Sequence, residues 1–232
     1  MTLDVIEGLK WYVVFVFSTT AHEAAHAWTS LKLGDDTAYR GGQVTLDPTP
    51  HIRREPVGMV AVPLISYVLG GWMIGWASAP YDPHWAMRHP KHAATMSLAG
   101  PAANLLILLT AALLIHVGIA FHYFDTPSSI NFSHVVDAGS PLGDVLASLL
   151  SIFFSLNLLL CTFNLLPLPP LDGSGALMFF TTPEKAEKVM ETMQQPAFQM
   201  IGLIIAWRVF SEIFPAIQLF AVNLLYPGVG YH

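Results

Sequence analysis

Four long apolar segments constrain how this chain of 232 residues can fold more than any other feature. A helix needs about 20 apolar residues to cross the hydrocarbon core of a bilayer, and each segment reaches that length. Lipid offers no hydrogen bonds to the backbone, so uninterrupted apolar runs of this length are expected to be helices. The segments are Trp11 to Leu31, Ala93 to Phe121, Val145 to Leu171 and Phe198 to Tyr226.

The composition agrees with a membrane protein. Only 11% of the residues are charged, whereas soluble domains carry about a quarter. The net charge of −6 argues against binding to nucleic acid. The chain has one Cys, Cys161, which excludes an internal disulfide framework and a Cys-rich metal site. Asp4 and Glu7 stand where a signal peptide would be basic, so the first segment is expected to be retained. We predict one all-α domain over residues 1–232 that crosses the cell membrane several times.

A fifth apolar stretch, Val57 to Ala77, is interrupted by a proline and a Gly-Gly pair. If it crosses the membrane, the basic loops 32–56 and 78–92 lie on opposite sides. If it enters and returns, both loops are cytoplasmic with the basic segment 182–197, and loop 122–141, which has no Lys or Arg, lies outside. The second arrangement agrees better with the positive-inside rule, so we predict a re-entrant element here.

The first apolar segment contains His22-Glu23-Ala24-Ala25-His26. Residues four apart lie on one face of a helix, so both imidazoles can bind one metal ion, and Glu23 can act as general base toward water. The pattern HExxH is typical of zinc proteases. Ionisable residues in hydrocarbon usually mark function, and the alternative is a helix whose polar residues merely face a bundle interior.

Catalytic zinc usually has three protein ligands and one open position, so a third ligand is needed. Asp172 is the only carboxylate between Asp144 and Glu184, and it follows a run with three prolines that cannot continue a helix. Irregular backbone at membrane depth is tolerated inside protein or beside a wet cavity, where a ligand would be presented. A helix N-cap or turn residue explains Asp172 equally well, and the two roles are compatible.

The other His residues have weaker claims to a metal. His84, His89 and His92 have a suitable spacing, but a solvated interfacial loop explains them better. His51 follows a turn-rich stretch and is a further candidate to approach the site. Two more, expected at the membrane interface near a helix end, are His116 and His122.

Two local features are predicted in the C-terminal third. Residues 184–195 are expected to form a short polar helix, with Pro183 at its first position and Pro196 after its end. Arg208 and Glu212 lie four residues apart and are placed to form an ion pair on a helix.

Three motifs together resemble the site-2 protease family of intramembrane zinc metalloproteases, in its compact form without a PDZ domain. They are HEAAH in the first segment, Ala99-Gly100-Pro101-Ala102-Ala103-Asn104 in the second, and Asn164-Leu-Leu-Pro-Leu-Pro-Pro-Leu-Asp-Gly173 in the third. Their order and spacing are also similar, over residues 11–181. Gly42-Gln-Val-Thr-Leu-Asp-Pro48, followed by His51, is similar to a segment of compact bacterial and archaeal members.

The resemblance implies that His22, His26 and Asp172 bind one Zn2+ per chain and that Glu23 activates water. Asn104 matches an Asn that positions or polarises the substrate, and Asn164 matches the Asn that begins the proline-rich motif. The implied fold is a three-helix catalytic core with a re-entrant or β-like element between the first two core helices, plus a C-terminal transmembrane helix.

The predicted activity is that of an intramembrane zinc endopeptidase, which hydrolyses peptide bonds within or near transmembrane segments of membrane proteins. Asn104 is expected to donate a hydrogen bond to the substrate or to the developing oxyanion. A substrate helix must unwind to be cut, and its extended segment can add to an edge strand near residues 41–47. The sequence identifies neither the substrate nor the oligomeric state.

Two other classes of protein remain open. A catalytically inactive zinc-binding scaffold would keep its ligands, but Glu23 would then be free to change, and it is present. A metal-ion transporter would have a chain of polar sites across the bilayer, whereas here the polar residues converge on one locus. A Glu23 substitution tests the first alternative, and metal flux in proteoliposomes tests the second.

Overall fold

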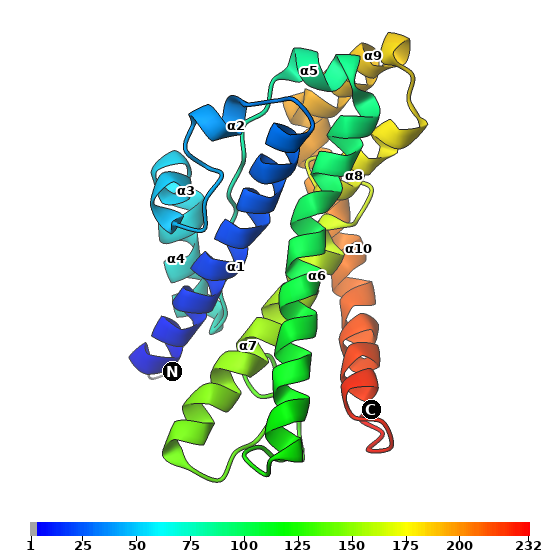
Figure 1. The fold of residues 1–232 in the computed structure, drawn as a ribbon. Helices are drawn as coiled ribbons and strands as arrows, with labels where there is room; N and C mark the ends of the chain where they lie inside the picture. Colours follow the sequence, from blue (N-terminus) through cyan, green and yellow to red (C-terminus); the bar gives the residue numbers. More distant parts are fainter. Residues whose placement is uncertain (1–3) are drawn as a thin grey trace.

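Helices supply the regular structure in the computed structural model, which describes residues 4–232 (Figure 1). Within that range there is no β-strand, only two isolated β-bridges in the loop after residue 120. The elements are α1 (Val5–Lys32), α2 (Thr37–Arg40), α3 (Pro48–Arg54), the π-helix η1 (Val57–Ala61), α4 (Val62–Gly70), α5 (Pro83–Arg88), α6 (Pro90–Ala120), α7 (Pro141–Asn164), α8 (Asp172–Ala176), the 3-10 helix η2 (Leu177–Phe180), α9 (Pro183–Gln194) and α10 (Pro196–Leu225).

Three of these helices are long and apolar enough to cross a membrane, namely α6, α7 and α10. They correspond to three of the four segments predicted from the sequence and confirm a multi-pass arrangement. The remaining segment, Trp11 to Leu31, lies within α1, a helix of 28 residues. Helix α1 is not among the spans defined by composition, because charged residues, two His and several Ser and Thr lower its apolarity. Its crossing therefore stays a prediction.

The helix ends lie where the sequence has its breaks. Asp4 caps α1, since its Oδ1 accepts from the backbone N–H of Ile6 at 3.0 Å. Helix α4 ends at Gly71, whose φ of 77° is readily adopted only by glycine. The predicted polar helix is confirmed as α9, and Arg208 lies 3.3 Å from Glu212 on α10.

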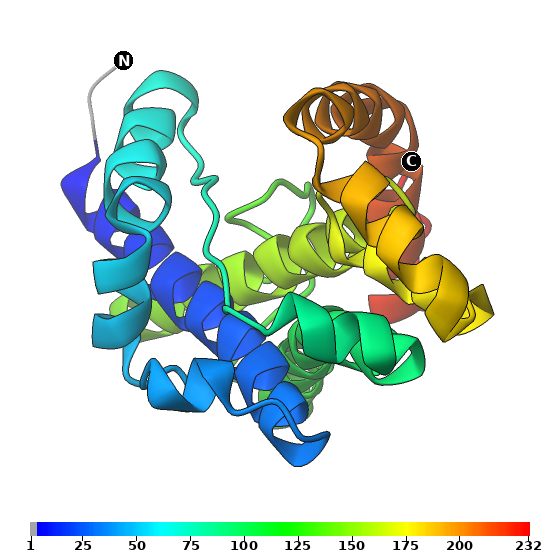
Figure 2. The same cartoon turned by 90° about the horizontal axis from the view of Figure 1, so that it is seen from above.

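The central unit is formed by α1, α6 and α7, which pack against one another, while α8 packs on α6. Helix α10 contacts α7 and leaves most of its length exposed on the outside of the bundle. Figure 2 shows α4 and α10 on opposite sides of the molecule. Helices α1 and α6 carry HEAAH and Asn104 as predicted, whereas Asp172 lies not on the third long helix, α7, but on α8, which follows it after residues 165–171.

The chain between α1 and α5 leaves one end of the bundle and returns to it. The backbone N–H of Asp82 donates to Oδ2 of Asp35 at 3.1 Å, so the start and end of this excursion are held together. At its far end, the Tyr67 hydroxyl of α4 donates to the Asp4 carbonyl at 2.7 Å, beside the first turn of α1. The excursion thus follows α1 along its length and comes back (Figure 1).

No edge strand forms at residues 41–47, where one was predicted. These residues adopt turns and bends, because side chains offer the backbone local partners in place of a ladder. Oγ1 of Thr45 accepts from the Asp47 N–H at 3.0 Å, and Nε2 of His51 lies 3.2 Å from the Thr45 carbonyl. The return segment, residues 73–82, also has no regular secondary structure.

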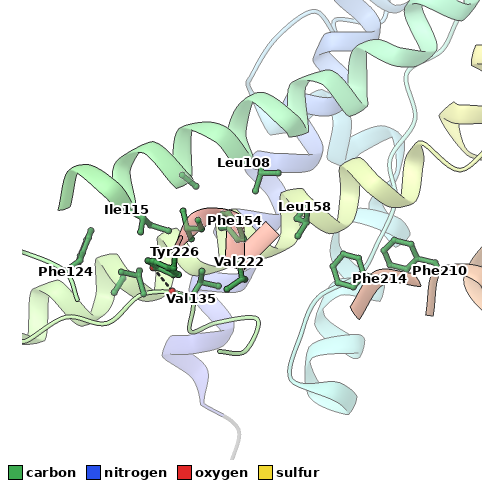
Figure 3. Packing of buried hydrophobic residues seen from close by; sticks show 14 residues of the cluster. Leu108, Ile115, Phe124, Val135, Phe154, Leu158, Phe210, Phe214, Val222 and Tyr226 are labelled. Carbon is green, nitrogen blue, oxygen red and sulfur yellow. Dashed lines mark hydrogen bonds between the residues drawn. The ribbon is translucent and has the colours of Figure 1, made fainter. Parts of the chain in front are cut away.

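A cluster of buried apolar side chains fixes the half of the bundle that lies away from α5 and α9. It joins α6, α7, α10 and the loop after α6, with Phe154 of α7 at its centre (Figure 3). The Tyr226 hydroxyl at the end of α10 donates to the Val135 carbonyl at 2.8 Å, which ties α10 to that loop. In lipid such clusters stabilise mainly by close packing, since lipid tails are as apolar as the side chains.

Phe154→Ala should therefore lower the stability of the folded protein, because it leaves a cavity at the centre of this cluster. Phe154 is 3% exposed, and we expect a loss on the order of 1–3 kcal/mol, less than in a soluble core because the transfer contribution is smaller in lipid. Thermal unfolding in detergent measures the loss. The matched control is Phe220→Ala, since that ring is 70% exposed on α10; equal effects of the two changes would contradict the packing described.

Candidate metal centre

Three side chains from two elements meet at one point in the upper half of the bundle. Nε2 of His22 and Nε2 of His26, both on α1, are 3.0 Å apart. Oδ2 of Asp172, at the start of α8, lies 3.0 Å from the first nitrogen and 3.4 Å from the second. The three atoms all lie within 4.8 Å of one another, which is the spacing expected of ligands around one ion.

The chain reaches this geometry for local reasons. His22 and His26 project from one face of α1, as a spacing of four residues requires. Helix α7 ends at Asn164, before the prolines, and α8 begins at Asp172, so that the chain turns back toward α1. The residue that occupies the N-cap of α8 is Leu171, and Oδ2 of Asp172 has no hydrogen-bond partner. The alternative in which Asp172 serves as an N-cap is therefore wrong.

The contacts of Nδ1 fix the tautomer of both imidazoles. Nδ1 of His26 lies 2.7 Å from the Met96 carbonyl oxygen, and Nδ1 of His22 lies 2.5 Å from Oδ1 of Asn104. Carbonyl and amide oxygens only accept hydrogen bonds, so each Nδ1 carries the proton. In the neutral ring each Nε2 then has a free lone pair, which is the form that binds metal.

The three converging atoms are consequently all acceptors. Two imidazole lone pairs and a carboxylate oxygen face one another, and the carboxylate oxygen is buried without a hydrogen-bond donor. Among residues 4–232, no Lys or Arg lies within 4.0 Å of the Asp172 carboxylate, whose contacts at that distance are Nε2 of His22 and of His26, and Glu23 has no basic side chain within that distance. Buried acceptors without a donor are costly, and a divalent cation would satisfy all three. The donor set of two His and one carboxylate fits zinc with an open position.

A cavity of about 280 Å3 adjoins this point and gives it room for a further group. Glu23, His26 and Asp172 line the cavity, so Glu23 borders the same space as two of the clustered residues. The opposite walls come from the return segment around Ser78 and from α9, including Met190. The site is thus enclosed by protein yet open to a small group or a stretch of peptide.

Helix α6 approaches the imidazoles through Gly100. A Cβ at this position would lie 2.4 Å from Nε2 of both His22 and His26, closer than real Cβ contacts come. The close approach of the two helices therefore requires glycine here. The glycine of the second motif therefore has a packing role, and the sequence alone did not reveal this role.

The other residues singled out in the sequence do not join the cluster. Asn164 donates through Nδ2 to the Leu160 carbonyl at 3.0 Å, one turn back on its own helix. His51 is buried on α3 against Thr45. His89 and His92 stack on each other with ring centroids 5.3 Å apart and stay exposed. The remaining His residues are also exposed: they are His84 on α5, His116 on α6 and His122 just after α6.

Sequence analysis missed two groups that contact the site or its neighbours. The Met96 carbonyl was not foreseeable, because any residue supplies one. Asn157, which contacts Asn104, carried a usable signal: it is an amide within a charge-free apolar segment, and polar groups in such segments are costly.

Three long apolar helices and a cluster of two buried His residues with the partly exposed Asp172 define a multi-pass membrane protein with a candidate metal site. The model of peptidase family M50 matches residues 11–209, and the chain belongs to this family. Membership confirms the resemblance to site-2 proteases noted in the sequence. No solved structure showed a significant match to the chain.

Two bacterial relatives carry names of the same kind. "Putative zinc metalloprotease YwhC" of Bacillus subtilis is 33% identical over 162 residues, which cover 69% of this chain and 64% of that protein. "Putative zinc metalloprotease Rip2" of Mycolicibacterium smegmatis is 27% identical over 230 residues, which cover 96% of this chain and 76% of that protein. The chain therefore spans less than two thirds of the length of YwhC.

Gly100→Ala should lower the metal content of the purified protein, because the added methyl group would occupy the space of the two Nε2 atoms. We expect most of the bound zinc to be lost at equal zinc supply, as measured by elemental analysis per chain. Gly139→Ala is the matched control, since a Cβ there would meet nothing within 4 Å. Full zinc content in the Gly100 variant would contradict the geometry of the site.

Proposed function

We propose that residues 1–232 form one intramembrane zinc endopeptidase domain, in which His22, His26 and Asp172 hold one Zn2+ per chain. The observation that supports this most directly is the convergence of three acceptor atoms, with both Nδ1 protons already assigned to other partners. Membership of peptidase family M50 supports the same activity. The proposed substrates are membrane proteins cut within or near their transmembrane segments.

The chemistry divides between the ion and Glu23. When bound, zinc polarises the scissile carbonyl and lowers the pKa of water. Glu23 lines the cavity beside Asp172, and its carboxylate is placed to accept the proton of the attacking water. The same carboxyl group can then give that proton to the leaving amine nitrogen. The enclosing walls keep bulk water away from the reacting bond.

For Asn104, we infer a positioning role in place of the predicted contact with the substrate. Its side chain is fully buried, and Oδ1 accepts from Nδ1 of His22. Its Nδ2 is directed toward Asn157 and the Ser18 carbonyl. With both ends of the amide engaged inside the core, Asn104 supports the tautomer of His22 and has no free donor for an oxyanion.

The excursion between α1 and α5 is proposed to enter the membrane and return. Its start and end are joined by the hydrogen bond between Asp82 and Asp35, which agrees with the charge distribution of the loops. Its return segment, residues 73–82, has neither helix nor strand and borders the cavity at Ser78. We infer that an unwound stretch of substrate pairs with the backbone there, and not at residues 41–47.

Glu23→Gln is expected to keep about one zinc per chain and to lower proteolysis by roughly 10²–10⁴-fold, because it removes the general base and no ligand. Asp172→Ala should lose both the zinc and the activity. The assay uses proteoliposomes that contain the enzyme and a panel of single-span reporter proteins with different transmembrane segments. Cleavage by Glu23→Gln at the wild-type rate would instead favour another role for this residue.

Thiol labelling in sealed vesicles tests the re-entrant arrangement, with Cys161 buried and so silent toward a membrane-impermeant reagent. Arg53→Cys and His84→Cys, both at exposed positions, should be labelled from the same face of the membrane. Ser129→Cys, in the loop after α6, should be labelled from the opposite face. Labelling of the first two variants from different faces would mean that the excursion crosses the membrane.

A further inference from the structure

We propose that Asn157 of α7 is a positioning residue that sets the tautomer of His22 through Asn104. The inference rests on the proposed metal site and concerns which nitrogen of His22 is free to bind the ion. It is carried by a chain of buried hydrogen bonds that begins at a backbone carbonyl in α7, passes through α6 and ends on α1.

The direction of every bond in this chain follows from its first member. Nδ2 of Asn157 lies 2.9 Å from the Phe153 carbonyl oxygen, which can only accept. The nitrogen of the Asn157 amide is therefore on that side, and its Oδ1 points the other way. Nδ2 also donates to the Ser18 hydroxyl on α1 at 2.9 Å. A hydroxyl can accept or donate, so this contact is compatible with the orientation that the Phe153 carbonyl fixes.

The orientation of Asn157 determines that of Asn104. Oδ1 of Asn157 lies 2.8 Å from the Asn104 side chain and accepts from its Nδ2. A second acceptor, the Ser18 carbonyl, lies 3.5 Å from the same nitrogen, at the limit of a hydrogen bond. With Nδ2 turned toward α7, Oδ1 of Asn104 faces Nδ1 of His22.

The consequence reaches the metal position. An oxygen facing Nδ1 of His22 places the ring proton there and leaves a lone pair on Nε2. A flipped Asn104 amide would present an NH2 group to Nδ1 and favour the other tautomer, which has a proton on Nε2, where the metal would bind. Asn104 and Asn157 are each 0% exposed, so water is not at hand to compensate. His26 needs no such relay, because a backbone carbonyl fixes its Nδ1 directly.

The experiment measures binding of Co2+ alone to the metal-free, detergent-purified full chain, by competition with a chelator. Asn157→Leu keeps the size of the side chain but no longer orients Asn104, and we expect about 10-fold weaker Co2+ binding, in the range of outer partners of metal ligands. The Ser18 carbonyl still biases Asn104, so the loss should be smaller than in Asn104→Ala. Asn157→Asp keeps an acceptor toward Nδ2 of Asn104 and should bind Co2+ nearly as tightly as wild type.

A double-mutant cycle separates positioning from a merely structural role. If Asn157 acts through Asn104, Asn104→Ala combined with Asn157→Leu should bind Co2+ no more weakly than Asn104→Ala alone. A general loss of packing would instead weaken binding in both backgrounds by the same factor. Thr162→Val is the matched control on α7, since within residues 4–232 the Thr162 hydroxyl bonds only to carbonyls of its own helix.

The outcomes distinguish this inference from the function on which it rests. Wild-type protein that binds no Co2+ would overturn the metal site and, with it, the role of Asn157. Wild-type binding that Asn157→Leu leaves unchanged, or a double variant whose losses multiply, would overturn the role of Asn157 and leave the metal site standing.

Discussion

The meeting of two imidazole lone pairs and one carboxylate oxygen inside the bundle is the interaction on which the rest of the structure depends. Such a group of acceptors is unfavourable in a low-dielectric interior unless a cation is shared among them. A bound ion would join α1 to α8, two elements that are far apart in sequence, so its binding energy would also stabilise the fold. Loss of such an ion would therefore loosen the fold as well as empty the site.

The packing of the core serves this interaction directly. In lipid, apolar contact alone does not drive helices together, and close packing and interhelical hydrogen bonds take a larger share. Gly100 lets α6 reach the imidazoles, and the amides of Asn104 and Asn157 connect α6, α7 and α1. The buried amides that link the three helices are thus the same groups that orient the imidazoles of the candidate metal site. The apolar cluster around Phe154 stabilises the other half of the bundle without touching the site.

Much of the fold could be predicted because membrane helices follow from length and apolarity. The segments assigned to α6, α7 and α10 agree with the structure, and prolines and glycines marked most of the ends. The prediction of a strand at residues 41–47 was wrong, because the pattern Val44-Thr45-Leu46 suits a strand only when a partner strand is present. Local bonds to Thr45 and the absence of such a partner in residues 4–232 produce turns instead.

The sequence by itself determined the chemistry available: HEAAH on one helical face, a lone carboxylate after a proline-rich break, and segments that must be helical in lipid. Only the tertiary structure decided how those groups are used. It turned Asp172 toward the His residues and not into an N-cap, and it enclosed the Asn104 amide between His22 and Asn157. The physical reason is that hydrogen-bond partners across helices depend on how the helices pack, and helical periodicity specifies a face but not which neighbour occupies it.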